Sequence, residues 1–239
     1  MFRVPKDKNY FSYSHTSYAP AVGTNPIGKL GRTTPTHLYA LWGKRCFDIV
    51  GAFLLLPLAL PLIVILAAFV AIDGSKPIYS HRRVGKNGRA FPCFKIRTMV
   101  ADSEARLKKL LREDPAAAAE WNRDFKLRKD PRITRLGRIL RKTSLDELPQ
   151  IWNVIRGDMS LVGPRPVTQD ELPLYRHVID SYMSVRPGMT GLWQISGRND
   201  ISYEERVELD HLYSKNLSLL EDLRILFMTL PAALRMTGA

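Results

Sequence analysis

Cysteine and histidine are scarce in this sequence. Its 239 residues include two cysteines, Cys46 and Cys93, and five histidines. Two cysteines make no disulfide framework and fit a reducing compartment. Neither the cysteines nor the scattered histidines have the spacing of metal ligands. The sequence therefore excludes a disulfide-rich scaffold and a metal site built on histidine.

Acidic residues are outnumbered by basic ones. Asp and Glu total 23 against 36 Lys and Arg, which gives a net charge of +13. So basic a chain is expected to meet an anionic partner, such as nucleic acid, a phosphorylated substrate or an acidic membrane surface. A basic but merely soluble surface has the same composition. No nucleic-acid-binding motif is present, so we expect no nucleic-acid partner.

The chain is predicted to have three parts. Residues 1–37 are rich in Ser, Thr, Tyr, Pro and Gly, without an apolar period, which is typical of a mobile N-terminal tail. They lack the apolar centre and cleavage site of a secretory signal. Residues 38–76 are predicted to be membrane-embedded, and residues 77–239 to form a cytoplasmic α/β domain that is mostly helical with a small sheet.

A long apolar run over residues 49–72 indicates a membrane helix, because it can cross a hydrocarbon core of about 30 Å. Pro57 and Pro61 lie inside it, and each removes a helical hydrogen bond. Cations lie on both flanks, unlike a simple span under the positive-inside rule. We therefore predict a re-entrant helical hairpin that breaks at the prolines and has both ends in the cytoplasm.

Two adjacent carboxylates, Asp146 and Glu147, precede an apolar helical pattern. Ser144 is predicted to be the N-cap, and Glu147 completes a capping box. Asp146 would then lie in the first helical turn, where the helix dipole keeps a carboxylate ionised at neutral pH. The pair is suited to act as a nucleophile or metal ligand, and capping alone is an equal alternative.

Several cations are candidate phosphate ligands. Lys95 and Arg97 are two residues apart on a predicted strand–turn–strand over residues 80–99, where a solvated strand edge is the alternative. Arg165 is held between two prolines, and a fixed guanidinium suits bidentate binding of phosphate, although an incidental arginine in a rigid loop is the alternative. Arg198 ends a glycine-rich loop.

Three further segments are predicted to be helical. Residues 101–129 form one amphipathic helix, residues 170–185 a second, and residues 217–236 a terminal helix that is interfacial or packed because charges interrupt it.

Five motifs occur in the same order as in a known family. They are Lys44-Arg45-x-Phe47-Asp48, Phe94-Lys95-x-Arg97-Thr98-Met99, Thr143-Ser144-Leu145-Asp146-Glu147-Leu148-Pro149-Gln150, Gly157-Asp158-Met159-Ser160-Leu161-Val162-Gly163-Pro164-Arg165-Pro166 and Arg186-Pro187-Gly188-x-Thr190-Gly191. From Lys44 onward the chain resembles the bacterial sugar transferases, which are small monotopic polyprenyl-phosphate phosphoglycosyl transferases. It looks most like the rhizobial exopolysaccharide enzymes that load galactose 1-phosphate onto undecaprenyl phosphate. Larger family members carry four further transmembrane helices and another domain, so we expect the minimal form.

The resemblance implies a ping-pong reaction. Asp146 would attack the β-phosphate of a UDP-sugar and release UMP, and undecaprenyl phosphate would then take the sugar phosphate from the aspartate. Glu147 matches the family's Mg²⁺ partner, and Arg165 matches the cation near the bound phosphate. Arg141 lies on the same polar approach, with a role that the motif does not define.

The resemblance also implies a location in the inner (cytoplasmic) membrane, with the catalytic domain on the cytoplasmic face among membrane lipids. Leu60-Pro61 stands where the family's helix breaks at a Ser-Pro pair, and Pro57 is an additional proline. UDP-galactose is the first choice of donor and UDP-glucose the alternative. A homodimer is compatible with the sequence. A non-enzymatic basic membrane scaffold is the competing hypothesis, and it leaves the acidic pair unexplained.

Overall fold

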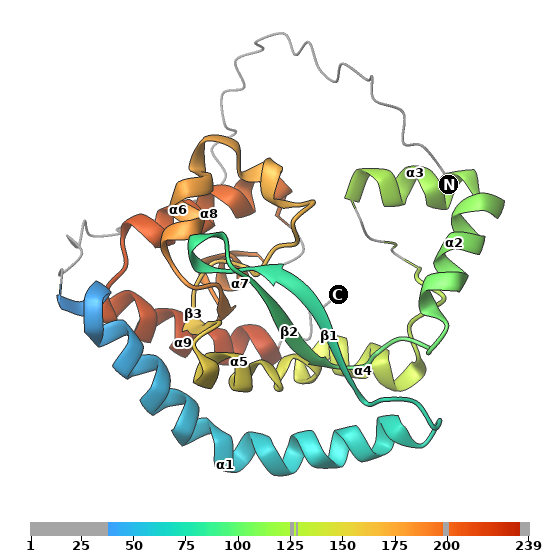
Figure 1. Cartoon of the computed structure of the whole chain (residues 1–239), viewed down its shortest axis with the longest axis horizontal. Coiled ribbons are helices and arrows are strands. Elements are labelled where there is room, and N and C mark those ends of the chain that lie inside the picture. The colour runs from blue at the N-terminus through green and yellow to red at the C-terminus, as the bar shows by residue number, and fades with distance from the viewer. Residues whose placement is uncertain (1–37, 125–126, 128, 198–200, 235–239) are drawn as a thin grey trace, which may run out of the picture. The chain divides into compact units, whose positions relative to one another are not determined.

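Helices dominate the described part of the chain, accompanied by two small sheets (Figure 1). The computed structural model describes residues 38–124, 127, 129–197 and 201–234, so the tail predicted over residues 1–37 lies outside the described residues. The prediction of a mostly helical fold with little sheet is confirmed.

The apolar run forms one continuous helix. A π-helical turn, η1 (Tyr39–Gly43), leads into α1 (Lys44–Ala71), and both Pro57 and Pro61 lie inside α1. Figure 1 shows α1 bending about halfway along its length. A proline removes one hydrogen bond and bends a helix without ending it when the flanking turns persist. The structure therefore has a single bent helix where the sequence predicts two helices separated by a break.

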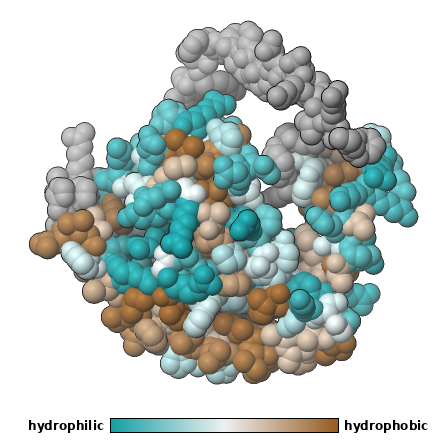
Figure 2. All heavy atoms as spheres, viewed as in Figure 1, coloured by the Kyte–Doolittle hydropathy of each residue, from teal (hydrophilic) through white to brown (hydrophobic). Residues whose placement is uncertain are grey.

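Most of the α1 surface is apolar and exposed. The stretch Tyr39–Ala71 spans 33 residues, and by length and composition it is able to cross a membrane. Ala52 and Ala59 are buried against the domain, whereas Leu54 and Leu58 are more than 70% exposed. Apolar residues gather along this edge of the molecule in Figure 2. Exposed apolar surface on this scale marks a contact with lipid or protein.

The predicted strand–turn–strand is confirmed as a hairpin. β1 (Ile78–Val84) pairs antiparallel with β2 (Ala90–Ile96), and the short helix η2 (Lys86–Gly88) makes the turn. Opposite residues in a ladder project from the same face. One face therefore carries the pairs Tyr79–Lys95, His81–Cys93 and Arg83–Phe91. A second, parallel sheet joins β3 (Ser160–Val162) to β4 (Gly188–Thr190).

The helix predicted over residues 101–129 is wrong in its continuity. The structure has two helices, α2 (Ser103–Glu113) and α3 (Pro115–Asp124), separated by Asp114 in an extended conformation. A residue before proline is pushed out of the helical region. The freed Asp114 side chain accepts hydrogen bonds from the backbone N–H groups of Ala116 and Ala117 and so begins α3.

The remaining helices follow α3 in the chain. They are α4 (Arg135–Thr143), η3 (Leu145–Glu147), α5 (Gln150–Arg156), η4 (Leu172–Val178), α6 (Ile179–Ser184), α7 (Leu192–Ser196), α8 (Tyr203–Lys215) and α9 (Leu219–Leu234). The helix predicted over residues 170–185 is divided, because Arg176 inside η4 has φ 42°.

A buried polar network fixes the start of α1 to the domain. Lys44 Nζ donates to Asp222 Oδ2 of α9 at 2.7 Å and to Asp48 Oδ1 at 3.3 Å. Tyr213 of α8 donates to the other oxygen of Asp222 at 2.7 Å. Arg45 donates to the carbonyls of Val154 and Ile155, at the end of α5. The start of α1 is therefore bonded to α9 and α5, and α8 joins the same network through Asp222.

Candidate active site

The Asp146-Glu147 pair lies at a sharp change of chain direction. α4 ends at Ser144, which adopts the left-handed conformation with φ 59°, and η3 follows at once. Ser144 makes no side-chain cap, so the predicted capping box is wrong. A new helix, α5, begins only at Gln150 after Pro149. Asp146 therefore sits in a single 3₁₀ turn between two helices instead of the first turn of a longer helix.

The apolar residues after the acidic pair are not all buried. Trp152 is 55% exposed, while Ile151 and Val154 are buried. The break at Pro149 rotates the residues that follow it. Asn153 is fully buried, accepts from the backbone N–H of Phe94 and donates to the carbonyl of Pro92. This asparagine fixes α5, and with it the acidic pair, against β2.

Asp146 is a buried carboxylate, with 7% of its surface exposed. Burial and the neighbouring Glu147 charge raise its pKa from 3.8 to about 6, against the opposing effects of Lys95 and Arg141. Asp146 is thus ionised at neutral pH, as predicted, but the cations keep it so in place of a helix dipole. A desolvated carboxylate with a raised pKa is a stronger nucleophile than an exposed one.

Lys95 contacts the pair directly. Its Nζ donates to Glu147 Oε1 at 2.7 Å, and the two side chains are 33% and 35% exposed. Burial lowers the pKa of Lys95, but attraction to Glu147 and Asp146 outweighs it, so the pKa is raised. Lys95 therefore stays charged beside both carboxylates.

Arg141 lies within electrostatic range of Asp146. Burial lowers its pKa, and the Asp146 charge partly restores it. Its Nε donates to Thr98 Oγ1 at 2.9 Å. A Cβ at Gly137 would lie 2.0 Å from the Thr98 carbonyl oxygen, so only glycine lets α4 approach the segment after β2 this closely. Lys95 and Arg141 are brought to the acidic pair.

Arg97 is committed elsewhere. Its guanidinium makes an ion pair with Asp73 and donates to the carbonyls of Val70, Lys76 and Met99. All five N–H groups of an arginine are thereby used. Arg97 therefore holds the end of α1 to β2, and the structure does not bring it to the acidic pair with Lys95.

Arg165 lies in the Pro-Arg-Pro loop after β3. Its guanidinium lies over the indole of Trp193, 5.6 Å from the ring centroid, and its backbone N–H donates to Asp210 Oδ2. Burial raises the pKa of Asp210 to about 7, although Tyr175 and Arg165 donate to it. Asp210 thus holds the loop through the Arg165 backbone N–H and does not bond to the Arg165 guanidinium.

The hairpin face that carries Cys93 and Lys95 adds one cation, Arg83, that was not a predicted site residue. Arg83 pairs with Glu171 at 3.0 Å. Burial and Glu147 raise the pKa of the Cys93 thiol to about 11, against the charges of Lys95, Arg83 and Arg165. The Cys93 thiol interacts electrostatically with Lys95, Arg83, Glu147 and Arg165, so these four side chains lie near the same part of β2. Alternation along β1 would have placed Arg83 on this face.

Arg198, Pro57 and Pro61 were also predicted as site residues. Arg198 lies outside the described residues. Pro57 and Pro61 lie in α1 and contribute to its bend, not to the acidic pair.

The site suits a magnesium ion through Glu147. Mg²⁺ is usually bound by one or two carboxylates together with substrate phosphates, not by an all-protein cage. The described residues contain no group of three His, Cys, Asp or Glu that could hold a metal. The half-exposed Glu147 carboxylate beside Asp146 fits the first arrangement.

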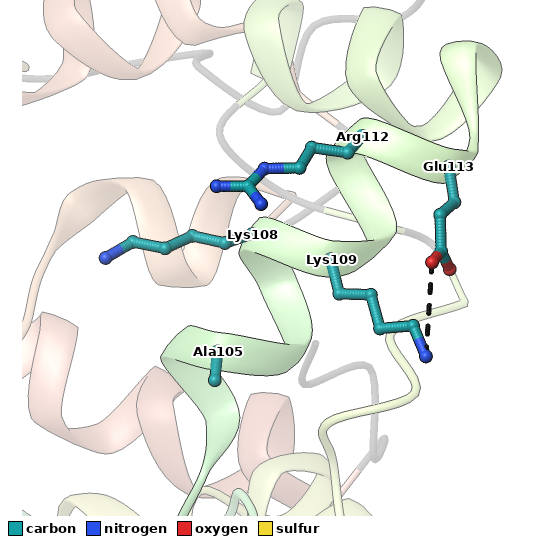
Figure 3. A pocket seen from close by; sticks show the side chains of 5 residues that line it. All are labelled: Ala105, Lys108, Lys109, Arg112 and Glu113. Atoms are coloured by element: carbon teal, nitrogen blue, oxygen red, sulfur yellow. Dashed lines mark ion pairs between the residues drawn. The ribbon is translucent and has the colours of Figure 1, made fainter.

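A separate hollow of about 430 Å³ lies along α2 (Figure 3). Its lining consists of Ala105, Lys108, Lys109, Arg112 and Glu113. Lys109 is paired with Glu113 at 4.0 Å, and Lys108 and Arg112 extend to one side. None of the residues around Asp146 lines it, so it is not part of this site.

Comparison with known proteins identifies a single family. Residues 39–236 match the family described as bacterial sugar transferase. The UDP-galactose-lipid carrier transferase of Erwinia amylovora is 58% identical over 196 residues, and the undecaprenyl-phosphate galactose phosphotransferase of Salmonella typhimurium is 55% identical. These matches cover 82% of this chain and 41% of each relative.

A shorter relative matches over most of its length. The exopolysaccharide production protein ExoY of Sinorhizobium fredii is 50% identical over 197 residues, which cover 82% of this chain and 87% of the relative. The resemblance inferred from the five motifs is confirmed by these matches.

Proposed function

Because this chain belongs to the bacterial sugar transferase family, we propose that it transfers a sugar 1-phosphate from a UDP-sugar to undecaprenyl phosphate and releases UMP. The carrying observation is the buried Asp146 with a pKa of about 6, flanked by Lys95 and Arg141. A carboxylate and a diphosphate repel each other, and flanking cations make their approach feasible.

In the first step, a carboxylate oxygen of Asp146 attacks the β-phosphorus of the UDP-sugar. A new P–O bond forms to the aspartate, and the bond to the oxygen bridging the two phosphates breaks. UMP leaves with that electron pair. Lys95 and Arg141 offset the charge that accumulates on the phosphate oxygens, and the sugar phosphate remains as an acyl phosphate diester on Asp146.

In the second step, a phosphate oxygen of undecaprenyl phosphate attacks the same phosphorus. The bond to Asp146 breaks, the carboxylate returns, and a polyprenyl diphosphate sugar is released. Glu147 is the residue that would hold Mg²⁺, which supplies neutralising charge to phosphate oxygens when bound. This chemistry initiates the assembly of an exopolysaccharide repeat unit.

A lipid substrate gives α1 its role. The exposed apolar surface of α1 supports insertion into the inner membrane, and α9 adds exposed Leu220 and Phe227 that suit the interface. Cations flank α1 on both sides, which supports the re-entrant arrangement with the domain on the cytoplasmic face. The bend of α1 would let both of its ends lie at the same face of the membrane.

Galactose is the proposed sugar. The relatives from Erwinia amylovora and Salmonella typhimurium carry galactose in their names. This chain spans about two fifths of the length of each relative. The assignment of galactose to this chain is therefore part of the proposal. UDP-glucose, which differs by one epimeric hydroxyl, is the alternative donor.

The test is UMP release by purified full-length protein in nanodiscs, with a panel of UDP-sugars and undecaprenyl phosphate. We expect release with UDP-galactose and none in Asp146→Asn, which keeps the shape of the side chain. A radiolabelled sugar phosphate should remain on the parent protein when the lipid is withheld. Full turnover by Asp146→Asn would exclude Asp146 as the nucleophile, and inactivity of the parent with every donor would favour the scaffold hypothesis.

A further inference from the structure

Two arginines from different elements share one indole ring. Arg165 comes from the loop after β3 and Arg206 from α8, and their guanidinium carbons lie 5.6 Å and 4.6 Å from the Trp193 ring centroid. Arg206 also lies over Tyr203, at 5.6 Å. Cations stack favourably on aromatic faces, so Trp193 is a platform that collects positive charge at one place.

These arginines lack the partners that buried arginines normally have. Arg206 is 7% exposed, and the Nε atoms of both Arg165 and Arg206 are buried without a hydrogen-bond partner. Within the described ranges, neither guanidinium has a carboxylate in ion-pair distance, in contrast to Arg83 or Arg132. A buried charge without a partner costs free energy, so the arrangement favours an additional anion.

The nearby carboxylates are occupied by other groups. Asp210 accepts from the Tyr175 hydroxyl and the Arg165 backbone N–H. Glu171 accepts from Arg83 and from Thr168. Burial lowers the pKa of Arg206, and repulsion from Arg165 lowers it further. Asp210 attracts both arginines and Glu171 attracts Arg165, but within the described ranges neither carboxylate forms an ion pair with them. The fold therefore holds two like charges together without a direct counter-ion.

We propose that Arg206, together with Arg165, binds a phosphate group of a substrate, with Trp193 holding both guanidinium groups in place. Arginine presents a planar fork that matches phosphate oxygens, and two forks suit a phosphate ester or a diphosphate. The proposal rests on the proposed function for the identity of the substrate. The phosphate belongs to the UDP-sugar, to the polyprenyl phosphate, or to each in turn.

The experiment measures binding to full-length protein in nanodiscs, in an Asp146→Asn background that prevents turnover. The probes are UDP-galactose, a short polyprenyl phosphate and inorganic pyrophosphate, each titrated by calorimetry. Arg206→Met should weaken binding about 10- to 100-fold, the range of a lost charge-assisted pair. Arg106→Gln, at an exposed ion pair on α2, is the matched control and should change nothing.

The pattern across probes identifies the source of the phosphate. If only UDP-galactose binds more weakly to Arg206→Met, the site belongs to the donor. If only polyprenyl phosphate does, the site belongs to the acceptor. If both bind more weakly, the two substrates share the site. Pyrophosphate tests the anion site independently of the proposed function. If it binds the parent and not Arg206→Met, the anion site is supported even where neither substrate binds. Unchanged affinity for all three probes would overturn the proposal.

Thermal unfolding distinguishes binding from a structural role. Because Arg206 is repelled by Arg165 and has no ion pair, Arg206→Met should keep or raise the Tm. If the methionine variant fails to fold, Arg206→Lys replaces it, and it should bind several-fold more weakly because the ammonium lacks the fork. Parent-like affinity of the lysine variant would then count against the site.

Discussion

Lys95 Nζ lies 2.7 Å from Glu147 Oε1, across the interface between β2 and the 3₁₀ turn that carries Asp146. The contact joins two segments that are 52 residues apart in the chain. It places a cation beside both carboxylates of the acidic pair while leaving a third of each partner exposed to solvent. The pair is thus partly neutralised before any substrate arrives.

Lys95→Met should lower UMP release about 100-fold, because a cation that offsets charge in the transition state is removed. Lys95→Arg should recover part of the rate, since it keeps the charge with different geometry. The Tm should change little, because partly exposed ion pairs contribute little to stability. Initial rates and thermal unfolding on the same preparations check both parts, and parent-like rates in Lys95→Met would refute the role.

Glu147→Gln should remove the response to magnesium. The amide keeps the size of the side chain but loses the charge that a divalent cation requires. Activity of the parent should disappear with chelator and return with Mg²⁺, whereas the variant should stay at least about 100-fold below the parent at every Mg²⁺ concentration. Metal-independent turnover by the parent would remove the assignment.

Arg97→Met should loosen the attachment of α1. Its five hydrogen bonds hold Val70, Asp73 and the turn at Lys76 to the end of β2, and the substitution leaves three carbonyls without their donor. We expect the Tm to fall by about 5 °C. Arg106→Met, at an exposed pair on α2, is the control and should leave the Tm unchanged. Equal Tm values for both variants would contradict the anchoring role.

Asp210 should make stability depend on pH. Burial raises its pKa from 3.8 to about 7, so the folded state holds this proton better than the unfolded state. Its contribution to stability is present below pH 3.8 and is lost as the pH rises through 7. Between pH 5 and pH 8 the parent should lose about 3 kcal/mol relative to Asp210→Asn.

The control for this titration is Asp102→Asn. Arg106 holds the pKa of the exposed Asp102 below its usual value, so it stays charged over the same range and should give no trend. Unfolding curves at several pH values for the three proteins provide the comparison. A flat difference between parent and Asp210→Asn would show that Asp210 does not titrate near 7.

Local patterns predicted the elements of this fold better than their ends. The strand–turn–strand predicted over residues 80–99 and a helix in the long apolar run are both present. The continuous helix expected after Ser144 does not form, because Ser144 is left-handed and Pro149 interrupts the chain before α5. The apolar spacing alone does not show where such an interruption falls. The Ser144 and Glu147 capping pattern does not reveal the interruption either.

The sequence predicts Lys95 and Arg97 together as phosphate ligands. The structure brings Lys95 to Glu147, whereas Arg97 pairs with Asp73, a residue whose proximity only the fold creates. Arg206 was not singled out, because in sequence it is one charge on a charged helix. Its stacking on Trp193 depends on how α7 and α8 pack.

The buried bond between Lys44 and Asp222 joins residues 178 positions apart. At about 5–20 residues per second, the ribosome makes Asp222 roughly 10–35 seconds after Lys44. Throughout that interval the Lys44 ammonium of the nascent apolar helix lacks the carboxylate that it contacts at 2.7 Å in the finished protein. Proteins shortened before α9 should therefore be poor substrates for maturation and good substrates for membrane proteases, even though every residue around Asp146 is present.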